Sequence, residues 1–376
     1  MTILAIPDSF KDSISSKEII SALRRGFKNL DPSIELIGCV GSDGGEGFLE
    51  AINFQVSAER IYHESLDPIG RSIEVEYLLD RSNRTAYIEL AQAAGLERLS
   101  EQERNPMFTT TAGTGLQIMH AINKGAEKIY IGLGGSSTND GGVGLASVLG
   151  FEFTDINGDR VLPIGNNLTH IHNIEGRFVS SEVKIFAVAD VRNPLLGPQG
   201  ASHTFAAQKG ASVGEIHHLE NGLSNLHQKV KSDLHKDDSD SPGSGAAGGA
   251  GYGLRVFLDA KLVSGIEFML QLADIESIIS EKKVDLIITG EGRLDHQSMQ
   301  GKLIDGVLNI ARPMGVPVMA ICGQLSLEEQ EYRKMGLAFA TTIAGPEVPV
   351  LKSMTDAAHY IEEVTPKLLQ QFNPQS

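Results

Sequence analysis

The stretch TILAIPDSFK, residues 2–11, joins an apolar run to a short polar loop that contains an aspartate and a lysine. Three later stretches have the same form, namely GSDGGEGF (Gly41–Phe48), AVADVRNP (Ala187–Pro194) and ITGEGRLD (Ile288–Asp295). In open α/β sheets, ligands bind at the carboxyl ends of the strands. Because four acidic loops follow apolar runs, the sequence predicts one shared polar site at strand ends.

The residues after the first loop predict a βαβ unit. Ser15 and Glu18 have the spacing of a capping box, which marks the start of a helix. Apolar residues then recur at helical spacing up to Leu30, and residues 34–40 form a second apolar run. We therefore expect two parallel strands joined by a right-handed crossover. No G-x-G-x-x-G string follows the first strand, which disfavours an NAD-binding site.

The C-terminal part of the chain also has the pattern of βα units. Short apolar runs alternate with helical patterns at residues 284–289, 316–322 and 337–343. A chain of 376 residues also exceeds the usual size of a single hydrophobic core. We therefore predict an α/β fold with two domains. A Rossmann-like domain is expected from residues 1–66 and 285–376, and an inserted mixed α/β domain from residues 67–284.

Three local features are also predicted. Pro366 should kink or break the last helix, residues 355–372. By composition alone, residues 232–253 are typical of a disordered linker. Cys39 and Cys322 adjoin predicted strands, so we expect buried thiols rather than a disulfide.

Composition narrows the class of partner. A formal net charge of −16 disfavours nucleic acid, because binding to phosphates needs a basic surface. The sequence has no uninterrupted apolar run of about 18 residues and no basic segment followed by an apolar run at its start. We therefore expect a cytoplasmic protein without a membrane partner. An anionic ligand would have to be bound by local cations, a metal ion or backbone amides.

A glycine-rich segment, IGLGGSSTNDGGVG at Ile131–Gly144, follows a predicted strand and precedes an apolar helix. Backbone N–H groups at such a position bind phosphate oxygens. The alternative is a tight turn without a ligand. Gly301-Lys302 is not a P-loop, because Leu303 follows it and the upstream glycine is missing. The residues expected to line a phosphate site are Gly134, Gly135, Ser136, Ser137, Thr138 and Asn139.

The acidic loops supply the groups that phosphoryl transfer requires. These are a carboxylate for the attacking hydroxyl, cations for the phosphoryl group and usually magnesium. Each acid alone could be a helix cap or a turn residue, but the set at strand ends favours a catalytic site. The carboxylates are Asp8, Asp43, Glu46, Asp190, Glu291 and Asp295, and the cations are Lys11, Arg192, Arg293 and Lys302.

Eight motifs, in order across nearly the whole chain, resemble those of the bacterial type I glycerate kinase family. They are PDSFKDS, DGGEGF, ELAQAAGL, TTAGTG, GGSSTNDGG, DVRNPLLGPQGA, PGSGAAGGAGYG and ITGEGRLDHQSMQGK. The resemblance implies ATP-dependent phosphorylation of D-glycerate, usually to 2-phosphoglycerate, by two α/β domains around a cleft. It also assigns GSGAAGGAGYG to a family motif rather than to a linker. Departures from the family pattern are Asp12, Ser137, Tyr252 and Ile304, which affect loop shape and remove no charged candidate.

The resemblance and the loop chemistry together suggest catalytic and substrate roles. We expect Asp190 to accept the proton of the substrate hydroxyl. It lies at a strand end, and its local sequence gives little indication that it caps a helix. Asp295 is the alternative acceptor. Arg293 or neighbouring backbone amides are expected to bind the carboxylate of D-glycerate. The other expected substrate-binding residues are Asp8, Ser9, Asn193 and Glu291.

The same reasoning suggests how ATP and Mg²⁺ are bound. Lys11 and the loop at residues 134–139 are expected to contact the ATP phosphates, and Gly248 and Gly249 are further nucleotide-binding candidates. Asp43 and Glu46 are the expected ligands of Mg²⁺.

Three alternatives stay open at this point. GLGGSS resembles the phosphate loop of the GHMP-type small-molecule kinases, although the proline that precedes that loop is missing. A nonenzymatic two-lobed sensor of hydroxy acids would also have a polar cleft. A kinase of another small hydroxy acid could make a 3-phospho product. A homodimer is the default expectation for the oligomeric state.

Overall fold

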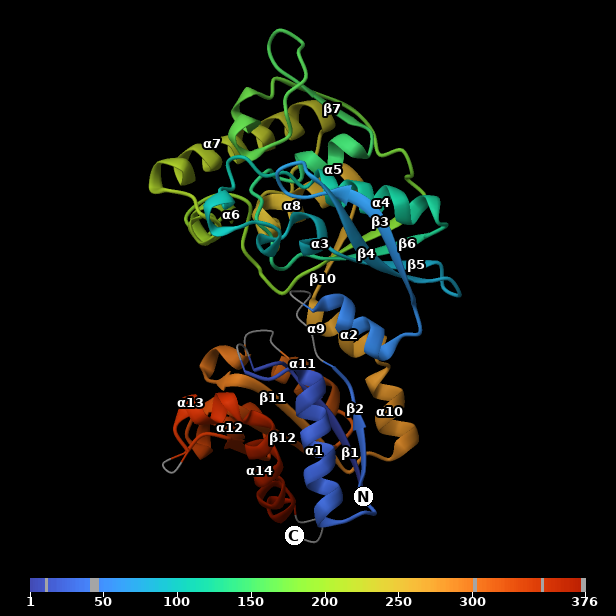
Figure 1. Cartoon of the computed structure of the whole chain (residues 1–376), viewed down its shortest axis with the longest axis vertical. Helices are drawn as coiled ribbons and strands as arrows, with labels where there is room; N and C mark the ends of the chain where they lie inside the picture. The colour runs from blue at the N-terminus through green and yellow to red at the C-terminus, as the bar shows by residue number, and fades with distance from the viewer. Residues whose placement is uncertain (11–12, 41–46, 300–302, 346–347, 373–376) are drawn as a thin grey trace. The chain divides into compact units, whose positions relative to one another are not determined.

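The computed structural model describes residues 1–10, 13–40, 47–299, 303–345 and 348–372. The chain divides into two compact units (Figure 1). Unit 1 comprises Met1–Asp43 with Ile266–Ser376, and unit 2 comprises Gly44–Gly265. Both ends of the described chain therefore lie in unit 1. The predicted α/β class and a first domain that is discontinuous in sequence are confirmed.

The bounds of the two units differ from those expected at residues 66 and 284. Strand β3 (Glu59–Leu66) belongs to unit 2, because it pairs along its whole length with β4 (Ser72–Asp80). Helices α9 (Gly265–Leu272) and α10 (Ile275–Lys282) contribute buried apolar side chains to the core of unit 1. The chain therefore crosses between the units near residues 43 and 265.

Unit 1 contains a parallel five-stranded sheet with the order β13-β12-β11-β1-β2. Within this unit the order is that of a flavodoxin-like, doubly wound sheet, and it reverses between β1 and β11. Ligands of such sheets bind beside this reversal, at the carboxyl ends of the strands. The strands are β1 (Thr2–Pro7), β2 (Glu35–Gly38), β11 (Leu286–Leu294), β12 (Val318–Leu325) and β13 (Phe339–Thr342).

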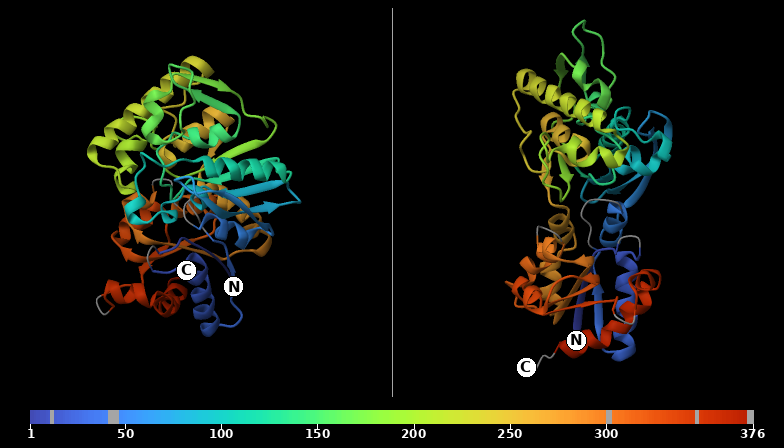
Figure 2. Two further views of the ribbon diagram at one scale, coloured as in Figure 1. Left: turned by 45° about the horizontal axis from the view of Figure 1, so that its top comes forward. Right: turned by 90° about the vertical axis from the view of Figure 1, so that its left-hand side faces the viewer.

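Helices cover both faces of this sheet. Gly38 of β2 lies against Ile20 of α1, whereas its neighbour Ile37 packs in the core that includes residues of α9 to α12. Figure 2 shows α1 (blue) and the α9–α11 region (orange) on opposite sides of the strands. The helices of unit 1, besides α9 and α10, are α1 (Ser16–Leu30), α11 (Leu303–Ala311), α12 (Glu329–Met335), α13 (Val350–Thr355) and α14 (Ala357–Gln371).

The local predictions for unit 1 have different outcomes. The capping box at the start of α1 is confirmed, because the Ser15 side chain accepts from the Glu18 backbone and the Glu18 carboxylate accepts from the Ser15 backbone. The predicted break at Pro366 does not occur, since α14 continues through this residue to Gln371. Cys39 and Cys322 are free and buried, as expected.

Unit 2 contains a mixed six-stranded sheet with the order β10-β9-β6-β5-β4-β3, and a separate β7–β8 hairpin. Strands β5, β6, β9 and β10 are parallel, whereas β3 and β4 are antiparallel. One face of the sheet forms the core with α4, α5 and α8. The remaining strands are β5 (Thr85–Glu89), β6 (Lys128–Gly132), β7 (Phe151–Thr154), β8 (Asn173–Gly176), β9 (Lys184–Val188) and β10 (Lys261–Val263).

The helices of unit 2 include the segment that composition alone assigned to a linker. Residues 246–258 form α8 and are almost entirely buried, so the linker interpretation is wrong. Gly248 and Gly249 have φ angles of 66° and 86°, which an L-residue rarely adopts. The helices are α2 (Phe48–Gln55), α3 (Ala91–Ala94), α4 (Ala112–Asn123), α5 (Val143–Val148), α6 (Ala201–Phe205), α7 (Val213–Lys229), a π-helical turn (Val230–Leu234) and α8 (Ala246–Leu258).

Among the described residues, no helix is both long enough and apolar enough to cross a membrane.

Candidate active site

The reversal of strand order in unit 1 carries a pocket of about 380 Å³. Asp8 and Ser9 follow β1, and Glu291 and Arg293 lie in the last part of β11. The two strands are in register here, with Pro7 beside Gly290 and the Asp8 backbone N–H bonded to the Gly290 carbonyl at 2.8 Å. The structure therefore brings together four of the five predicted substrate-binding residues.

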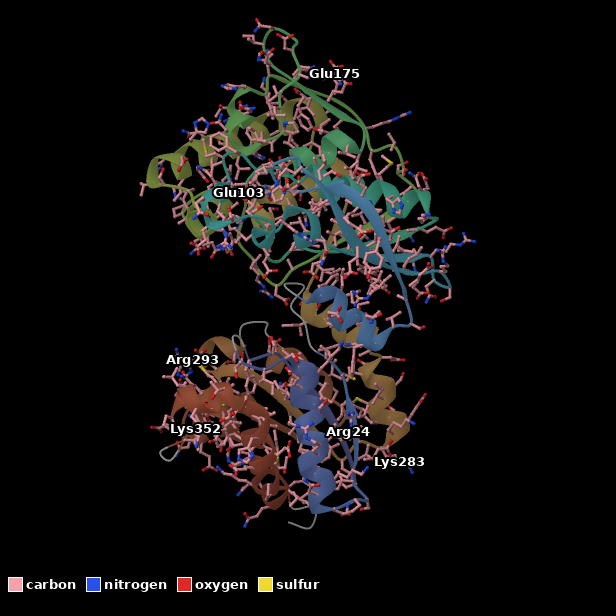
Figure 3. All side chains as sticks on the ribbon, in the orientation of Figure 1. Arg24, Glu103, Glu175, Lys283, Arg293 and Lys352 are labelled. Atoms are coloured by element: carbon pink, nitrogen blue, oxygen red, sulfur yellow. The ribbon has the colours of Figure 1, made fainter. Side chains whose placement is uncertain are left out.

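The remaining walls of this pocket come from the segment after β1, from β11 and β12, from the residue after β13 and from α13. Figure 3 labels Arg293 and also Lys352, which belongs to α13. The wall residues that adjoin the acidic loops are Phe10, Ser13, Gly292, Gly323, Gln324, Ile343, Val350, Ser353 and Met354.

The charged groups of the pocket are partly exposed. The side chain of Arg293 is 64% exposed, and its Nε lies 3.5 Å from Asp295 Oδ2. An exposed ion pair at this distance is weak, so the guanidinium can bind an anionic ligand. Asp8 Oδ1 accepts a hydrogen bond from the Ser9 backbone N–H at 2.7 Å, which fixes the carboxylate beside the turn.

Cys322 lies beside Glu291 in the sheet but is not a nucleophile. Burial and, to a lesser extent, the nearby carboxylate of Glu291 raise the pKa of its thiol to about 12. A thiol with this pKa stays protonated at neutral pH, and only the thiolate is a strong nucleophile. The polar groups that line the pocket are instead carboxylates, serine hydroxyls, the Gln324 amide and the Arg293 guanidinium.

Asp190 follows β9 in unit 2, and its carboxylate is hydrogen-bonded to the segment where α9 begins. Its Oδ1 accepts hydrogen bonds from the Ser264 hydroxyl at 2.7 Å and from the Gly265 backbone N–H at 3.0 Å. Gly265 is the first residue of α9, so Asp190 caps this helix start. The expectation that Asp190 contributes little to helix capping is therefore wrong. No local sequence pattern indicates this role, because the partners are more than 70 residues away in the chain.

Asn193, the fifth predicted substrate-binding residue, stabilises its own loop. Its side-chain N–H donates to the Gln199 carbonyl at 2.7 Å, and its backbone carbonyl accepts from the Gly245 N–H at 2.9 Å. These bonds connect the DVRNPLLGPQGA motif to the segment before α8. The structure thus shows a loop-ordering contact for Asn193.

The glycine-rich segment after β6 is largely internal. Gly135 is exposed and Gly134 is half-buried, whereas the side chains of Ser137, Thr138 and Asn139 are at most 1% exposed. Ser137 donates to the Ala94 carbonyl, and Asn139 donates to the Ser202 hydroxyl. In this structure these side chains are part of the unit 2 interior rather than an open lining.

Gly248 and Gly249 are also buried, because they pack against this segment. A Cβ on Gly248 would lie 1.9 Å from the Thr138 carbonyl oxygen, and a Cβ on Gly249 would lie 3.0 Å from the Gly141 Cα. The glycines of α8 therefore allow the backbone of residues 138–141 to approach closely. Their positive φ angles are a packing requirement.

Lys209 is a site residue that the sequence did not reveal. Its Nζ donates to the Ser136 hydroxyl at 2.7 Å and to the Thr138 carbonyl at 2.8 Å, and the residue is only 2% exposed. Burial lowers the pKa of the Lys209 ammonium to about 7, although the carboxylate of Asp140 opposes this shift. Lys209 ends an ordinary short turn, AQK, so no local pattern distinguishes it.

Asp140 joins two of the glycine-containing motifs, TTAGTG and GGSSTNDGG. It is fully buried and accepts from the backbone N–H and hydroxyl of Thr111, both at 2.8 Å. It also accepts from the N–H groups of Gly142 and Gly144 at the start of α5, both at 3.1 Å. Burial raises the pKa of Asp140, and these four bonds lower it in turn. The carboxylate thus fixes the end of the glycine-rich segment.

Four predicted residues, Lys11, Asp43, Glu46 and Lys302, lie outside the described residues. Within the described ranges, no group of three or more His, Cys, Asp or Glu side chains could hold a metal ion. Magnesium with a nucleotide usually needs only one or two carboxylates in addition to the phosphates. The residues that are described are therefore compatible with such an ion.

Comparisons with known proteins identify the family of the chain. The model of the glycerate kinase family matches residues 3–373. The chain is 39% identical over 329 residues to the glycerate 2-kinase of Escherichia coli K12, covering 87% of this chain and 86% of that protein. It is 37% identical over 365 residues to the glycerate kinase of Bacillus subtilis 168, covering 96% and 95%.

A solved structure extends the comparison to the fold. A crystal structure assigned as glycerate kinase 2 from Salmonella typhimurium LT2 matches with a TM-score of 0.84 and 35% identity, over 99% of this chain and 100% of that one. The resemblance found in the sequence motifs is confirmed, and the GHMP-type alternative is not. The chain therefore belongs to the glycerate kinase family, a family of phosphotransferases.

Proposed function

We propose that this protein transfers the γ-phosphoryl group of ATP to D-glycerate and forms 2-phospho-D-glycerate. The observation that carries the proposal is the pocket at the strand-order reversal of unit 1, where Asp8, Ser9, Glu291 and Arg293 converge. A small hydroxy acid needs a cation for its carboxylate and acceptors for its hydroxyl protons, and this set of residues supplies both. The name of the E. coli relative supports the 2-position as the site of phosphorylation.

Arg293 is the proposed ligand of the glycerate carboxylate. Its guanidinium is the exposed cation of the pocket and can form two parallel hydrogen bonds to a carboxylate. Asp8 and Glu291 are proposed to accept hydrogen bonds from the glycerate hydroxyls, and Ser9 to donate one. These contacts would hold the substrate in a fixed pose, which decides the hydroxyl that reacts. Asn193 is proposed to act on substrate binding through the loop that it orders.

Gly134 and Gly135 are the proposed contacts of the ATP phosphates, because they are the part of the glycine-rich segment that reaches the surface. The buried residues Ser136, Ser137, Thr138 and Asn139 would fix the loop backbone, as would Gly248 and Gly249 of α8. Lys209 would add a positive charge directly beneath the loop. Preorganised backbone N–H groups over a buried cation favour phosphate oxygens. Lys11 is a further proposed phosphate contact.

Asp190 is the proposed acceptor of the proton from the attacking hydroxyl. A general base must be held in a fixed orientation, and the bonds from Ser264 and Gly265 to Oδ1 provide this. Asp295 is the alternative, because it lies beside Arg293. Asp43 and Glu46 are the proposed protein ligands of Mg²⁺, which when bound supplies positive charge against the phosphoryl oxygens.

The test of the activity is ADP release that depends on D-glycerate. Purified protein with ATP and Mg²⁺ is expected to release ADP at a rate that saturates with D-glycerate. A hydroxy-acid sensor would bind D-glycerate, as measured by calorimetry, without accelerating ADP release. Binding without ADP release would therefore overturn the proposed activity and favour the sensor.

A further inference from the structure

A second pocket, of about 760 Å³, lies in unit 2 and has no place in the proposed reaction. It is built at the amino ends of β9 and β10, whereas Asp190 follows the carboxyl end of β9. Five strand residues separate the two ends, which corresponds to roughly 16 Å. Volumes of this size are typical of small-molecule sites. The pocket is thus a separate feature of the same unit.

The charge of this pocket is opposite to that of the protein. The whole chain has a formal net charge of −16, yet the pocket is lined by Arg177, Lys184, Lys236 and Lys261 against the single carboxylate of Asp259. Lys236 is neutralised, because its Nζ lies 2.6 Å from Asp259 Oδ1 and donates to the Val256 carbonyl. Three cations therefore face the pocket with no carboxylate among its walls to balance them.

These three cations are also without an ion pair elsewhere in the described part of the chain. Arg177, Lys184 and Lys261 are exposed, and none has a carboxylate within 4.0 Å among the described residues. They come from different places in the chain: Arg177 follows β8, Lys184 begins β9 and Lys261 begins β10. Figure 3 labels Glu175, which lies two residues before Arg177. Cations gathered from three separate elements concentrate the positive potential in one pocket.

The walls between the cations are aromatic and aliphatic. Phe186 of β9 is half-buried and stacks on Tyr130 with ring centroids 4.6 Å apart and planes 12° from parallel. Phe178 and Phe257 are buried behind the pocket surface, and Val179 is 60% exposed beside them. A flat apolar group can lie on such a wall while the cations bind a negative group at its edge.

We infer that this pocket is a binding site for a small aromatic anion. The ligand class follows from the pairing of aromatic walls with three unneutralised cations, in a volume that fits one small molecule. The inference is independent of the proposed reaction, because none of the residues assigned to D-glycerate, ATP or Mg²⁺ lines the pocket.

The test uses two dyes that share an aromatic body and differ in charge. The anion 8-anilinonaphthalene-1-sulfonate is titrated against the full-length protein in the presence of saturating ATP and D-glycerate, and fluorescence gives the dissociation constant. The neutral N-phenyl-1-naphthylamine is the matched dye. We expect one saturable site for the anion, and binding of the neutral dye weaker by about tenfold or more, since the charge contributes most of the difference.

The variant Arg177→Gln/Lys184→Gln/Lys261→Gln is expected to weaken binding of the sulfonate dye by about tenfold or more. Lys28→Gln/Lys282→Gln/Lys334→Gln is the control, because it makes the same change in net charge at exposed positions outside the pocket. It should alter the dissociation constant by about twofold at most. Neither variant should change glycerate-dependent ADP release.

Val179→Glu gives an independent check that does not depend on the cations. The side chain is 60% exposed, so a carboxylate can be placed there without a cost to the core, and it should repel the sulfonate dye. Equal binding of the dye to wild type, to the triple pocket variant and to Val179→Glu would overturn the inference. Absence of a saturable site, or equal binding of the two dyes, would also overturn it.

Discussion

The Nζ of Lys209 lies 2.7 Å from the hydroxyl of Ser136, buried beneath the glycine-rich loop of unit 2. A second bond, to the Thr138 carbonyl at 2.8 Å, holds the same loop from below. A buried ammonium is costly unless something compensates it, and burial lowers the pKa of Lys209 to about 7. At the proposed nucleotide site, an anionic phosphate over the loop would offset this cost, and nucleotide binding would then depend on the charge of Lys209.

The first prediction concerns pH. The Lys209 ammonium is charged below its pKa of about 7 and neutral above it. Because the charged form attracts phosphates, KM for ATP should rise as pH increases from 6 to 8.5. Lys209→Arg keeps its charge over this range, so its KM for ATP should vary less with pH. Steady-state kinetics at fixed free Mg²⁺ measure both.

Lys209→Met removes the charge altogether and should raise KM for ATP by about tenfold at pH 6.5, with KM for D-glycerate changed much less. The ionisation of ATP itself is common to all three proteins and cancels in the comparison. Identical pH profiles for wild type and Lys209→Arg would contradict a role for the Lys209 charge in nucleotide binding.

The second prediction separates the chemical role of Asp190 from its capping role. In Asp190→Asn the amide oxygen can still accept from Ser264 and Gly265, but the group is no longer a base. We expect kcat to fall by about 100-fold or more with little change in the melting temperature. Asp190→Ala, which loses both bonds, should lose activity and stability together.

Ser264→Ala is the control for Asp190, because it removes one orienting bond and leaves the carboxylate. Its kcat should fall by much less than that of Asp190→Asn. A folded Asp190→Asn protein with near-normal kcat would show that Asp190 is not the base. The same measurement on Asp295→Asn would then test the alternative.

The third prediction concerns Arg293 in the pocket of unit 1. Arg293→Gln removes the exposed guanidinium proposed for the substrate carboxylate, so KM for D-glycerate should rise by about tenfold or more. KM for ATP should stay nearly constant. Arg333→Gln is a matched control, since Arg333 is also exposed but pairs with Glu329 outside the pocket. An equal effect on both KM values would argue against a carboxylate contact.

The fourth prediction concerns the packing of α8 on the glycine-rich loop. Gly248→Ala would place a Cβ 1.9 Å from the Thr138 carbonyl oxygen at a φ of 66°, so either the loop or the helix must move. We expect the free energy of unfolding to fall by about 3 kcal/mol or more. Gly214→Ala in α7 is the control, because nothing lies within 4 Å of its added Cβ. Urea unfolding of both variants measures the difference.

Much of unit 1 could be predicted from the sequence because its signals are local. The apolar runs at both chain ends, the Ser15–Glu18 capping box and the acidic turns after β1 and β11 are each contained in a few residues. Parallel strands then place those turns at one edge of the sheet. The convergence of Asp8, Glu291 and Arg293 follows from this geometry.

The rest depended on long-range contacts that no local pattern contains. Residues 232–253 have the composition of a linker, but the positive φ angles of α8 are stabilised by close packing on residues 138–141. The capping role of Asp190 needs Ser264, and the burial of Lys209 needs Ser136, 73 residues earlier. The first unit bound differs from the expected one because β3 pairs with β4 along its whole length, a contact that the apolar pattern before residue 66 does not reveal.

The most direct test of the central claim is identification of the reaction product by phosphorus NMR. Purified protein is incubated with ATP, Mg²⁺ and D-glycerate, and the products are compared with authentic 2-phosphoglycerate and 3-phosphoglycerate. The account predicts 2-phospho-D-glycerate and ADP in equal amounts. Formation of 3-phosphoglycerate would contradict the proposed substrate pose, and the absence of any phosphorylated glycerate would contradict the proposed activity itself.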